Sequence, residues 1–180
     1  MKYIKLYFQK TLRYLLKPLS FVPAICIMIF IYYMSAQDGT TSAGLSYKLS
    51  NKFVLLADAI LHKNWDLLQL AYYTDIIHHY VRKLAHITEY FALAASITFP
   101  LYVYRLRGWK LLLFASVFCI SFAGLDEYHQ SFVAGRGPSV KDVFIDSIGI
   151  FPGILCTQLM CYIGRITIFA PLAKKKIPKK

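Results

Sequence analysis

The chain has 180 residues, of which 57% are hydrophobic and only 17% are charged, and its formal net charge is +12. Soluble domains carry roughly 25% charged residues, so a mean hydropathy of +0.47 argues against an ordinary soluble enzyme. The basic residues flank long apolar runs instead of covering a soluble domain, which excludes nucleic acid as the expected partner. The length fits a single domain over residues 1–180.

Four apolar stretches approach the roughly 20 residues that are needed to cross a bilayer. They predict an all-α, polytopic membrane protein, with a bundle of about four transmembrane helices at about 19–34, 84–104, 109–125 and 143–163. No small-residue cleavage pattern directly follows the first stretch, so we expect a retained span there and not a signal peptide. All four cysteines lie inside these spans, where free cysteine acts as a small hydrophobic residue.

Basic residues orient membrane helices because Lys and Arg are retained on the cytoplasmic side. Residues 1–18, the loop 105–110 and the basic tail 165–180 hold 14 of the 21 Lys and Arg and none of the nine Asp and Glu. We therefore expect a multi-pass protein with both termini in the cytoplasm. The chemistry of the chain should then lie on the outer side.

An amphipathic outer segment, 45–80, is predicted between the first two spans. Apolar residues recur at three- and four-residue spacing at its start: Leu45, Leu49, Phe53, Leu56 and Ile60. This spacing predicts an amphipathic helix, which would lie either in the outer membrane interface or over the bundle as a lid. Residues 65–83 contain neither Gly nor Pro and run into the second span, so one long or bent helix is expected there.

Polar residues mark the start of the second span. Helical spacing places Lys83, His86 and either Glu89 or Tyr90 on one stripe. A carboxylate within an apolar span costs about 3 kcal/mol on insertion scales, so Glu89 should face the bundle and find a partner. The alternative for His86 is an interfacial residue that a neighbouring group satisfies.

A second polar cluster ends the third span. If that helix continues beyond residue 125, Asp126, His129 and Gln130 share one face, and Glu127 lies roughly a quarter-turn away. The glycines on either side of Arg136 allow backbone conformations that are closed to other residues, which predicts a turn there.

The fourth span begins with a capping signal and two carboxylates. Ser139 followed by Asp142 is similar to a capping box, although Asp reaches back less far than Glu. Asp146 lies one turn after Asp142, inside the apolar run, so their common face should point inward. We expect the polar residues of these three spans to converge in one pocket that is open to the outer side. The alternatives are helix capping for Asp142 and a structural ion-pair network for the charged residues.

These motifs resemble the VanZ-like family of bacterial membrane proteins. The resemblance covers about residues 20–155 and is carried by Ser35-Ala36-Gln37, by Lys83, His86, Glu89 and Tyr90, and by the long series Asp126, Glu127, Gln130, Phe132, Arg136, Asp142, Asp146 and Gly149. Many members have Asn at the position of Asp146, and the segment 45–80 has no clear counterpart. The resemblance implies a bacterial plasma-membrane protein, and the named member of the family is linked with reduced susceptibility to the glycopeptide teicoplanin.

Two classes of function are compatible with this pattern. The first is a protein that binds a lipid-linked cell-wall precursor or a lipidated glycopeptide and so lowers glycopeptide susceptibility. Its ligand-binding residues would be Lys83, His86, Glu89, Tyr90, Gln130, Arg136, Asp142 and Asp146.

The second class is a membrane-embedded enzyme that acts on a cell-envelope lipid or precursor. Glu127 or His129 would be the general base, and Asp126 would orient the base or help to hold a divalent metal, together with His86 and Asp142. The residue types specify no particular metal or cofactor. A small transporter or flippase is a further alternative, disfavoured by the low number of spans and by the lack of an inverted repeat.

Overall fold

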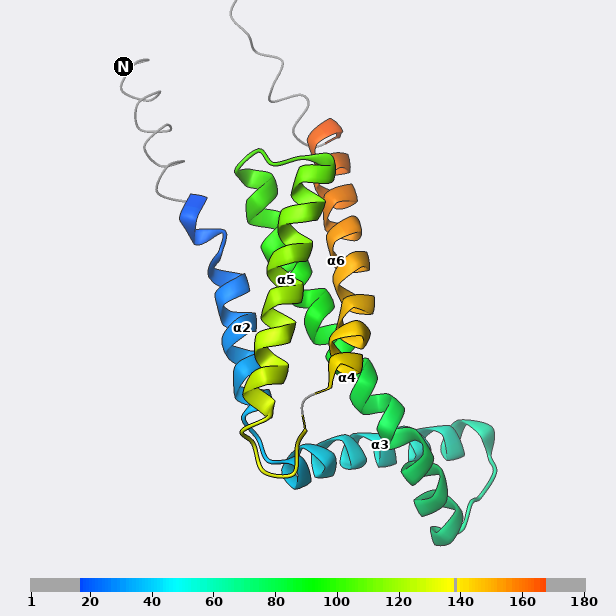
Figure 1. The fold of residues 1–180 in the computed structure, drawn as a ribbon. Coiled ribbons are helices and arrows are strands. Elements are labelled where there is room, and N and C mark those ends of the chain that lie inside the picture. The colour runs from blue at the N-terminus through cyan, green and yellow to red at the C-terminus, as the bar shows by residue number, and fades with distance from the viewer. Residues whose placement is uncertain (1–16, 138, 168–180) are drawn as a thin grey trace, which may run out of the picture.

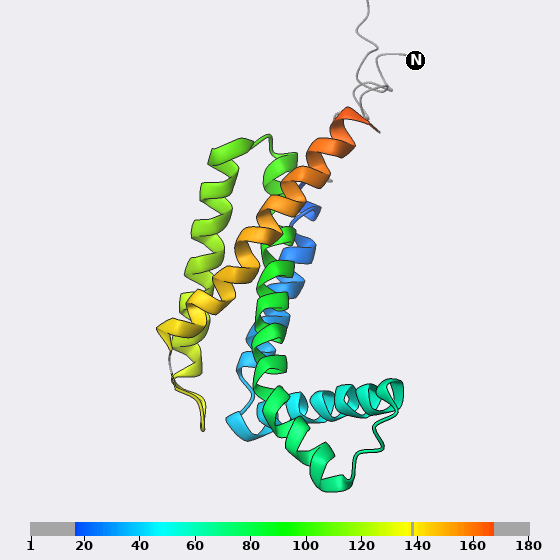
Figure 2. The same ribbon diagram turned by 90° about the vertical axis from the view of Figure 1, so that its right-hand side faces the viewer.

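The computed structural model describes residues 17–137 and 139–167, and every regular element within them is a helix. The helices that form the fold are α2 (Val22–Ser35), α3 (Gly39–Leu61), α4 (Leu67–Val103), α5 (Gly108–Gln130) and α6 (Val140–Ile166). Figures 1 and 2 show α2, α4, α5 and α6 running lengthwise in one bundle, with α3 crosswise at one end. We call this the α3 end. The predicted all-α class is confirmed.

The apolar helices fit a membrane bundle. Among the described residues, three helices are long and apolar enough to cross a membrane: Lys17–Ser35, Gly108–Gln130 and Val140–Ile166. The second predicted span, 84–104, is not among these three helices; it corresponds to the second half of α4, which contacts α2, α5 and α6. Most of the segment 1–18 and of the basic tail 165–180 lies outside the described residues.

The second predicted span is part of a much longer helix. α4 begins at a capping box in which Asp66 accepts the Gln69 N–H and the Gln69 side chain accepts the Asp66 N–H. It continues without a break to Val103, as the lack of Gly and Pro in 65–83 predicts. Its first half projects beyond the bundle and packs against α3 (Figure 1).

α3 begins at Gly39, before the predicted amphipathic pattern, because Asp38 caps it. The Asp38 carboxylate accepts the backbone N–H of Thr41 and the hydroxyls of Thr40 and Thr41. These hydrogen bonds, that of Thr40 foremost, lower the pKa of Asp38 to about 2. Farther along the helix, Ser50 and Val54 are buried, whereas the remaining apolar residues of α3 are largely exposed.

The bundle core combines small residues with a few large ones. Its buried members are Ala24, Ile31, Tyr90, Leu93, Ala94, Ile97, Leu111, Ala115, Cys119, Ala123, Ile150 and Ile154. Small side chains let helix backbones approach closely, which is the usual mode of helix packing in membranes.

The closest helix contact joins α4 and α6 through two glycines. A Cβ at Gly149 would overlap the backbone carbonyl of Ile87, and a Cβ at Gly153 would lie 2.6 Å from the carbonyl oxygen of Phe91. Gly149 and Gly153 form a G-x-x-x-G pattern on one face of α6. The contact therefore fixes how closely the polar start of α6 can approach α4.

We expect Gly149→Ala to destabilise the protein by about 1–3 kcal/mol, because a methyl group would be forced against backbone atoms that cannot move aside. The matched control is Gly124→Ala in α5, where an added Cβ meets no atom within 4 Å. That change should be neutral or gain up to about 1 kcal/mol of helix propensity. Melting temperatures in detergent would compare the two, and equal values would contradict this account of the contact.

Candidate functional site

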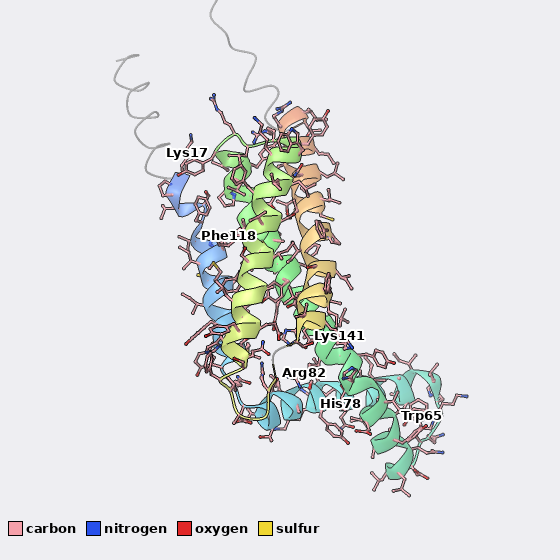
Figure 3. All side chains as sticks on the ribbon, viewed as in Figure 1. Lys17, Trp65, His78, Arg82, Phe118 and Lys141 are labelled. Atoms are coloured by element: carbon pink, nitrogen blue, oxygen red, sulfur yellow. The ribbon has the colours of Figure 1, made fainter. Side chains whose placement is uncertain are left out.

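A polar cavity of about 240 Å³ lies at the α3 end of the bundle, where α4, α5, α6 and the loop between α5 and α6 meet. It is lined by His79, Arg82, Lys83, His86, Glu127, Gln130, Gly135, Arg136, Gly137, Asp142, Ile145 and Asp146. Figure 3 shows Arg82 and Lys141 at this end of the molecule and Lys17 at the other. The cavity therefore gathers side chains from segments that are far apart in the sequence.

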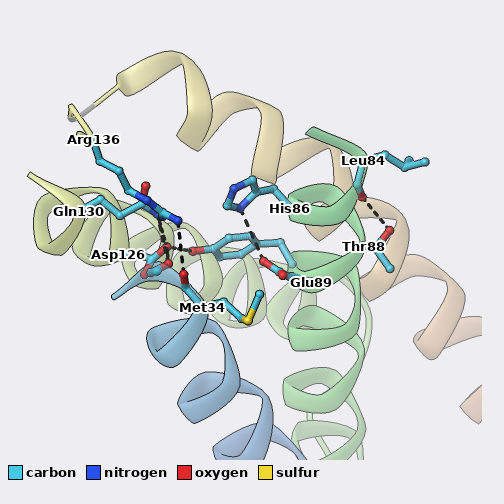
Figure 4. Close-up of polar contacts among 10 residues, drawn as sticks. Met34, Leu84, His86, Thr88, Glu89, Asp126, Gln130 and Arg136 are labelled. Atoms are coloured by element: carbon cyan, nitrogen blue, oxygen red, sulfur yellow. Dashed lines mark hydrogen bonds and ion pairs between the residues drawn. The ribbon is translucent and has the colours of Figure 1, made fainter. Parts of the chain in front are cut away.

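Behind the cavity, one buried carboxylate oxygen joins three helices. Oδ2 of Asp126 in α5 accepts the Ser35 hydroxyl of α2 at 2.8 Å, the Gln130 side-chain amide at 3.0 Å and the Tyr90 hydroxyl of α4 at 3.3 Å. The Gln130 amide also donates to Ser35 Oγ at 3.2 Å. Each such hydrogen bond contributes about 1 kcal/mol, so this network ties the helix ends together (Figure 4).

The loop after α5 is held against the joint between α2 and α3. The Gly39 N–H donates to the carbonyl of Ala134 at 3.0 Å, and a Cβ at Gly39 would overlap the carbonyl of Gly135. Gly135 has φ of +72°, a conformation that glycine adopts without steric cost. Gly137 is not among the glycines with positive φ, so only one of the two predicted glycines serves in this way.

This loop carries Arg136 over the end of α2. Arg136 Nη2 donates to the Met34 carbonyl at 3.4 Å, while its Nε and Nη1 atoms are buried without a hydrogen-bond partner among the described residues. Burial, together with the positive charge of Arg82, lowers the pKa of Arg136. A guanidinium group with two unsatisfied nitrogen donors beside a cavity is suited to bind an anion.

The predicted capping box at Ser139 is wrong. Ser139 is the N-cap residue of α6, but its side chain makes no capping hydrogen bond. Its backbone N–H instead donates to Glu127 Oε2 at 2.9 Å, and Asp142 lines the cavity. The approach of α5 therefore overrides the local capping signal.

The polar side chains at the start of the second predicted span point in two directions. His86 Nδ1 lies 3.6 Å from Glu89 Oε2, and Glu89 lines a second cavity of about 110 Å³ that also contacts Arg136 and the first turns of α3. Tyr90 is fully buried, and its hydroxyl donates to Asp126. Glu89 thus faces the protein, as expected for a carboxylate in an apolar span.

Seven of the eleven predicted site residues line the cavity: Lys83, His86, Glu127, Gln130, Arg136, Asp142 and Asp146. Asp126 and Tyr90 lie buried behind it, and Glu89 lines the adjacent smaller cavity.

His129 lies on the same face of α5 as Asp126 and Gln130, as the helical spacing predicts, but its side chain contacts α2 and not the cavity. Its ring stacks on Tyr32 of α2, with 4.6 Å between the ring centroids, and it does not line the cavity.

Sequence reasoning missed three polar residues of the site. His79 and Arg82 line the cavity one turn before Lys83 and His86, and Ser35 stands out in the sequence only as part of a motif. The signal for His79 and Arg82 is present in the sequence, because both continue the same helical stripe. Within the described ranges, no group of three or more His, Cys, Asp and Glu residues is placed to hold a metal ion.

We expect Tyr90→Phe to lower the free energy of unfolding by about 1 kcal/mol, because the ring stays buried but Asp126 loses one donor. The control is Tyr128→Phe in α5, close to Asp126 in the sequence. The Tyr128 side chain is 64% exposed and lies outside the network. Asp126→Ala should cost more, at least about 2 kcal/mol, because it leaves several donors unsatisfied. Unfolding measured in detergent would test this order, and a Tyr128→Phe cost as large as that of Tyr90→Phe would contradict it.

Comparison with known proteins places this architecture in a family. No curated protein and no solved structure matches the chain. The model of the VanZ/LLP1 family matches residues 20–161, a range that includes every residue of the cavity. The chain therefore belongs to the VanZ/LLP1 family of membrane proteins.

Proposed function

We propose that the cavity at the α3 end binds the anionic headgroup of a lipid-linked cell-wall precursor or of a lipidated glycopeptide, and that this binding lowers glycopeptide susceptibility. The observation that carries the proposal is the pair of buried, unpartnered nitrogen donors on Arg136. Leaving such donors unsatisfied costs free energy, which an anionic ligand would recover.

The charges around the cavity support an anion with some selectivity. Arg82 and Lys83 line the same cavity as Arg136, and neither forms an ion pair with another described residue. Glu127 and Asp142 would accept hydrogen bonds from hydroxyl or amide groups of the ligand, which orients it. Such a mixture of donors and acceptors is typical of sites that recognise a polar headgroup.

An apolar tail has a route beside the same cavity. Leu45 and Leu49 of α3 line the smaller cavity that contacts Arg136, and both side chains are about half exposed. α3 exposes further apolar residues on the same helix, which favours a position in the membrane interface over that of a lid. A lipid could then place its headgroup at Arg136 and its chain along α3.

The enzyme alternative has weaker support. Of the three candidate catalytic residues, only Glu127 lines the cavity. One oxygen of Asp126 is occupied by three donors, and His129 stacks against α2. We therefore favour binding over catalysis.

Arg136→Lys should weaken binding of a polyprenyl pyrophosphate by at least about tenfold, because Lys keeps the charge but lacks the planar pair of donors. Binding would be measured on the full-length protein in lipid nanodiscs. Teicoplanin susceptibility of a host that expresses each variant would be measured in parallel, with expression level and melting temperature as controls for folding.

The matched control for charge is Lys141→Gln at the start of α6, an exposed lysine that is absent from the cavity lining. It should leave binding unchanged. Full binding by a well-folded Arg136→Lys variant would remove Arg136 from the site and overturn the proposal. Loss of the effect on susceptibility in Glu127→Gln with binding retained would favour the enzyme alternative.

We further propose a bacterial plasma-membrane location with both termini in the cytoplasm, so that the α3 end faces outward. Single cysteines introduced at Lys63 and Ser139 should react with an impermeant thiol reagent from outside intact cells, and one at Lys176 should not, because basic segments stay on the cytoplasmic side. The native cysteines lie within apolar helices. Labelling of the parent protein, which contains only these cysteines, gives the background signal. Labelling at position 176 from outside would reverse the orientation.

A further inference from the structure

A long apolar groove runs along the bundle at the end opposite α3. It has a volume of about 950 Å³ and is formed by α2, α4 and α6, together with the loop between α4 and α5. Its walls consist mainly of small and apolar residues, among them Pro23, Ala92, Ala95, Phe99, Met160 and Gly164. The groove does not share a lining residue with the polar cavity.

Three arginines stand at the mouth of this groove. Arg105 and Arg107 come from the loop between α4 and α5, and Arg165 comes from the last turn of α6. In both ribbon views this loop and the end of α6 lie at the same end of the bundle (Figures 1 and 2). None of the three forms an ion pair within the described part of the chain, and no acidic residue lines the groove.

A buried hydroxyl group adds a second polar feature to the groove. Tyr102 lines it, and the Tyr102 hydroxyl is buried without a hydrogen-bond partner among the described residues. The Arg107 guanidinium lies 3.3 Å from the centroid of the Tyr102 ring and donates to the carbonyls of Tyr102 and Leu106. Arg107 is therefore held in place, and the Tyr102 hydroxyl remains to be satisfied by another molecule.

The backbone at Arg105 ends α4 in a Schellman motif. Its φ of +72° lies in the left-handed region that often follows the last residue of a helix, and the Leu106 N–H donates to the Leu101 carbonyl at 3.1 Å. The Arg105 backbone N–H donates to the Tyr102 carbonyl at 3.1 Å, which closes the turn after α4. The turn thus places the Arg105 side chain at the groove.

We infer that this groove binds an anionic diacyl phospholipid, with its phosphate at Arg105 and Arg165 and one acyl chain along the apolar wall. Basic pockets between transmembrane helices are suited to anionic lipid headgroups. A free phosphate would leave the apolar groove unfilled. A second copy of the chain would bring a similarly basic end, including Lys110, against these arginines, so the charges favour a lipid.

The inference can be tested by native mass spectrometry of the full-length protein in detergent, titrated with dioleoyl phosphatidylglycerol or dioleoyl phosphatidylcholine. We expect the anionic lipid to form a one-to-one adduct at clearly lower concentration. Arg105→Gln or Arg165→Gln, which each remove one arginine, should weaken the binding of phosphatidylglycerol about fivefold. This factor corresponds to about 1 kcal/mol for each basic residue near a lipid headgroup. Lys110→Gln, at the same end but outside the groove lining, should leave this binding unchanged.

Two more variants distinguish lipid in the groove from lipid bound elsewhere on the bundle. Ala95→Phe should fill the groove and abolish the adducts of both lipids. Size-exclusion chromatography would show whether this variant is folded. The arginine variants test the inference independently of it. Lys141→Gln, at the α3 end and outside the lining of both the cavity and the groove, should not affect the binding of phosphatidylglycerol. Equal binding of the two lipids, an equal effect of Lys110→Gln, loss of the adduct in Lys141→Gln, displacement by inorganic phosphate or a dimer that excludes lipid would each overturn the inference.

Discussion

The need to satisfy one carboxylate inside an apolar bundle governs the arrangement of the α3 end. Asp126 is 6% exposed, and a charge in such surroundings is tolerated only with hydrogen-bonding partners. Those partners come from α2 and α4 as well as from α5, through Ser35, Tyr90 and Gln130. The same contacts that satisfy this carboxylate therefore set the relative positions of three helix ends directly behind the cavity.

Close contacts at glycines position the remaining parts of the α3 end, namely α6 and the loop after α5. Gly149 and Gly153 let α6 approach the α4 backbone, which brings Asp142 and Asp146 to the same cavity as His86. On the other side, Gly39 lets the loop after α5 lie against the start of α3. Close contacts between backbones thus position the helices around the cavity. The charged side chains of the cavity are not needed to hold these helices together.

Charge is divided unequally between the two ends of the bundle, and each end can recognise a different part of a membrane. The cavity at the α3 end combines cations with carboxylates, so it can select for the shape and hydrogen bonding of a headgroup. The groove at the opposite end has arginines and no carboxylate in its lining, so it distinguishes anionic from neutral lipids. Binding at the second site would anchor the bundle without competing for ligands of the first.

The sequence alone determined the helices, because hydropathy and helical periodicity are local properties: the apolar helices, the unbroken α4 and the polar stripe through His86 follow from residues near one another in the chain. Tertiary packing decided the rest. His129 turned toward Tyr32 and away from the cavity, and the backbone N–H of Ser139 paired with Glu127 in place of a local cap. Spacing along one helix cannot specify which neighbouring helix will supply a partner, and that choice depends on how closely the backbones can approach.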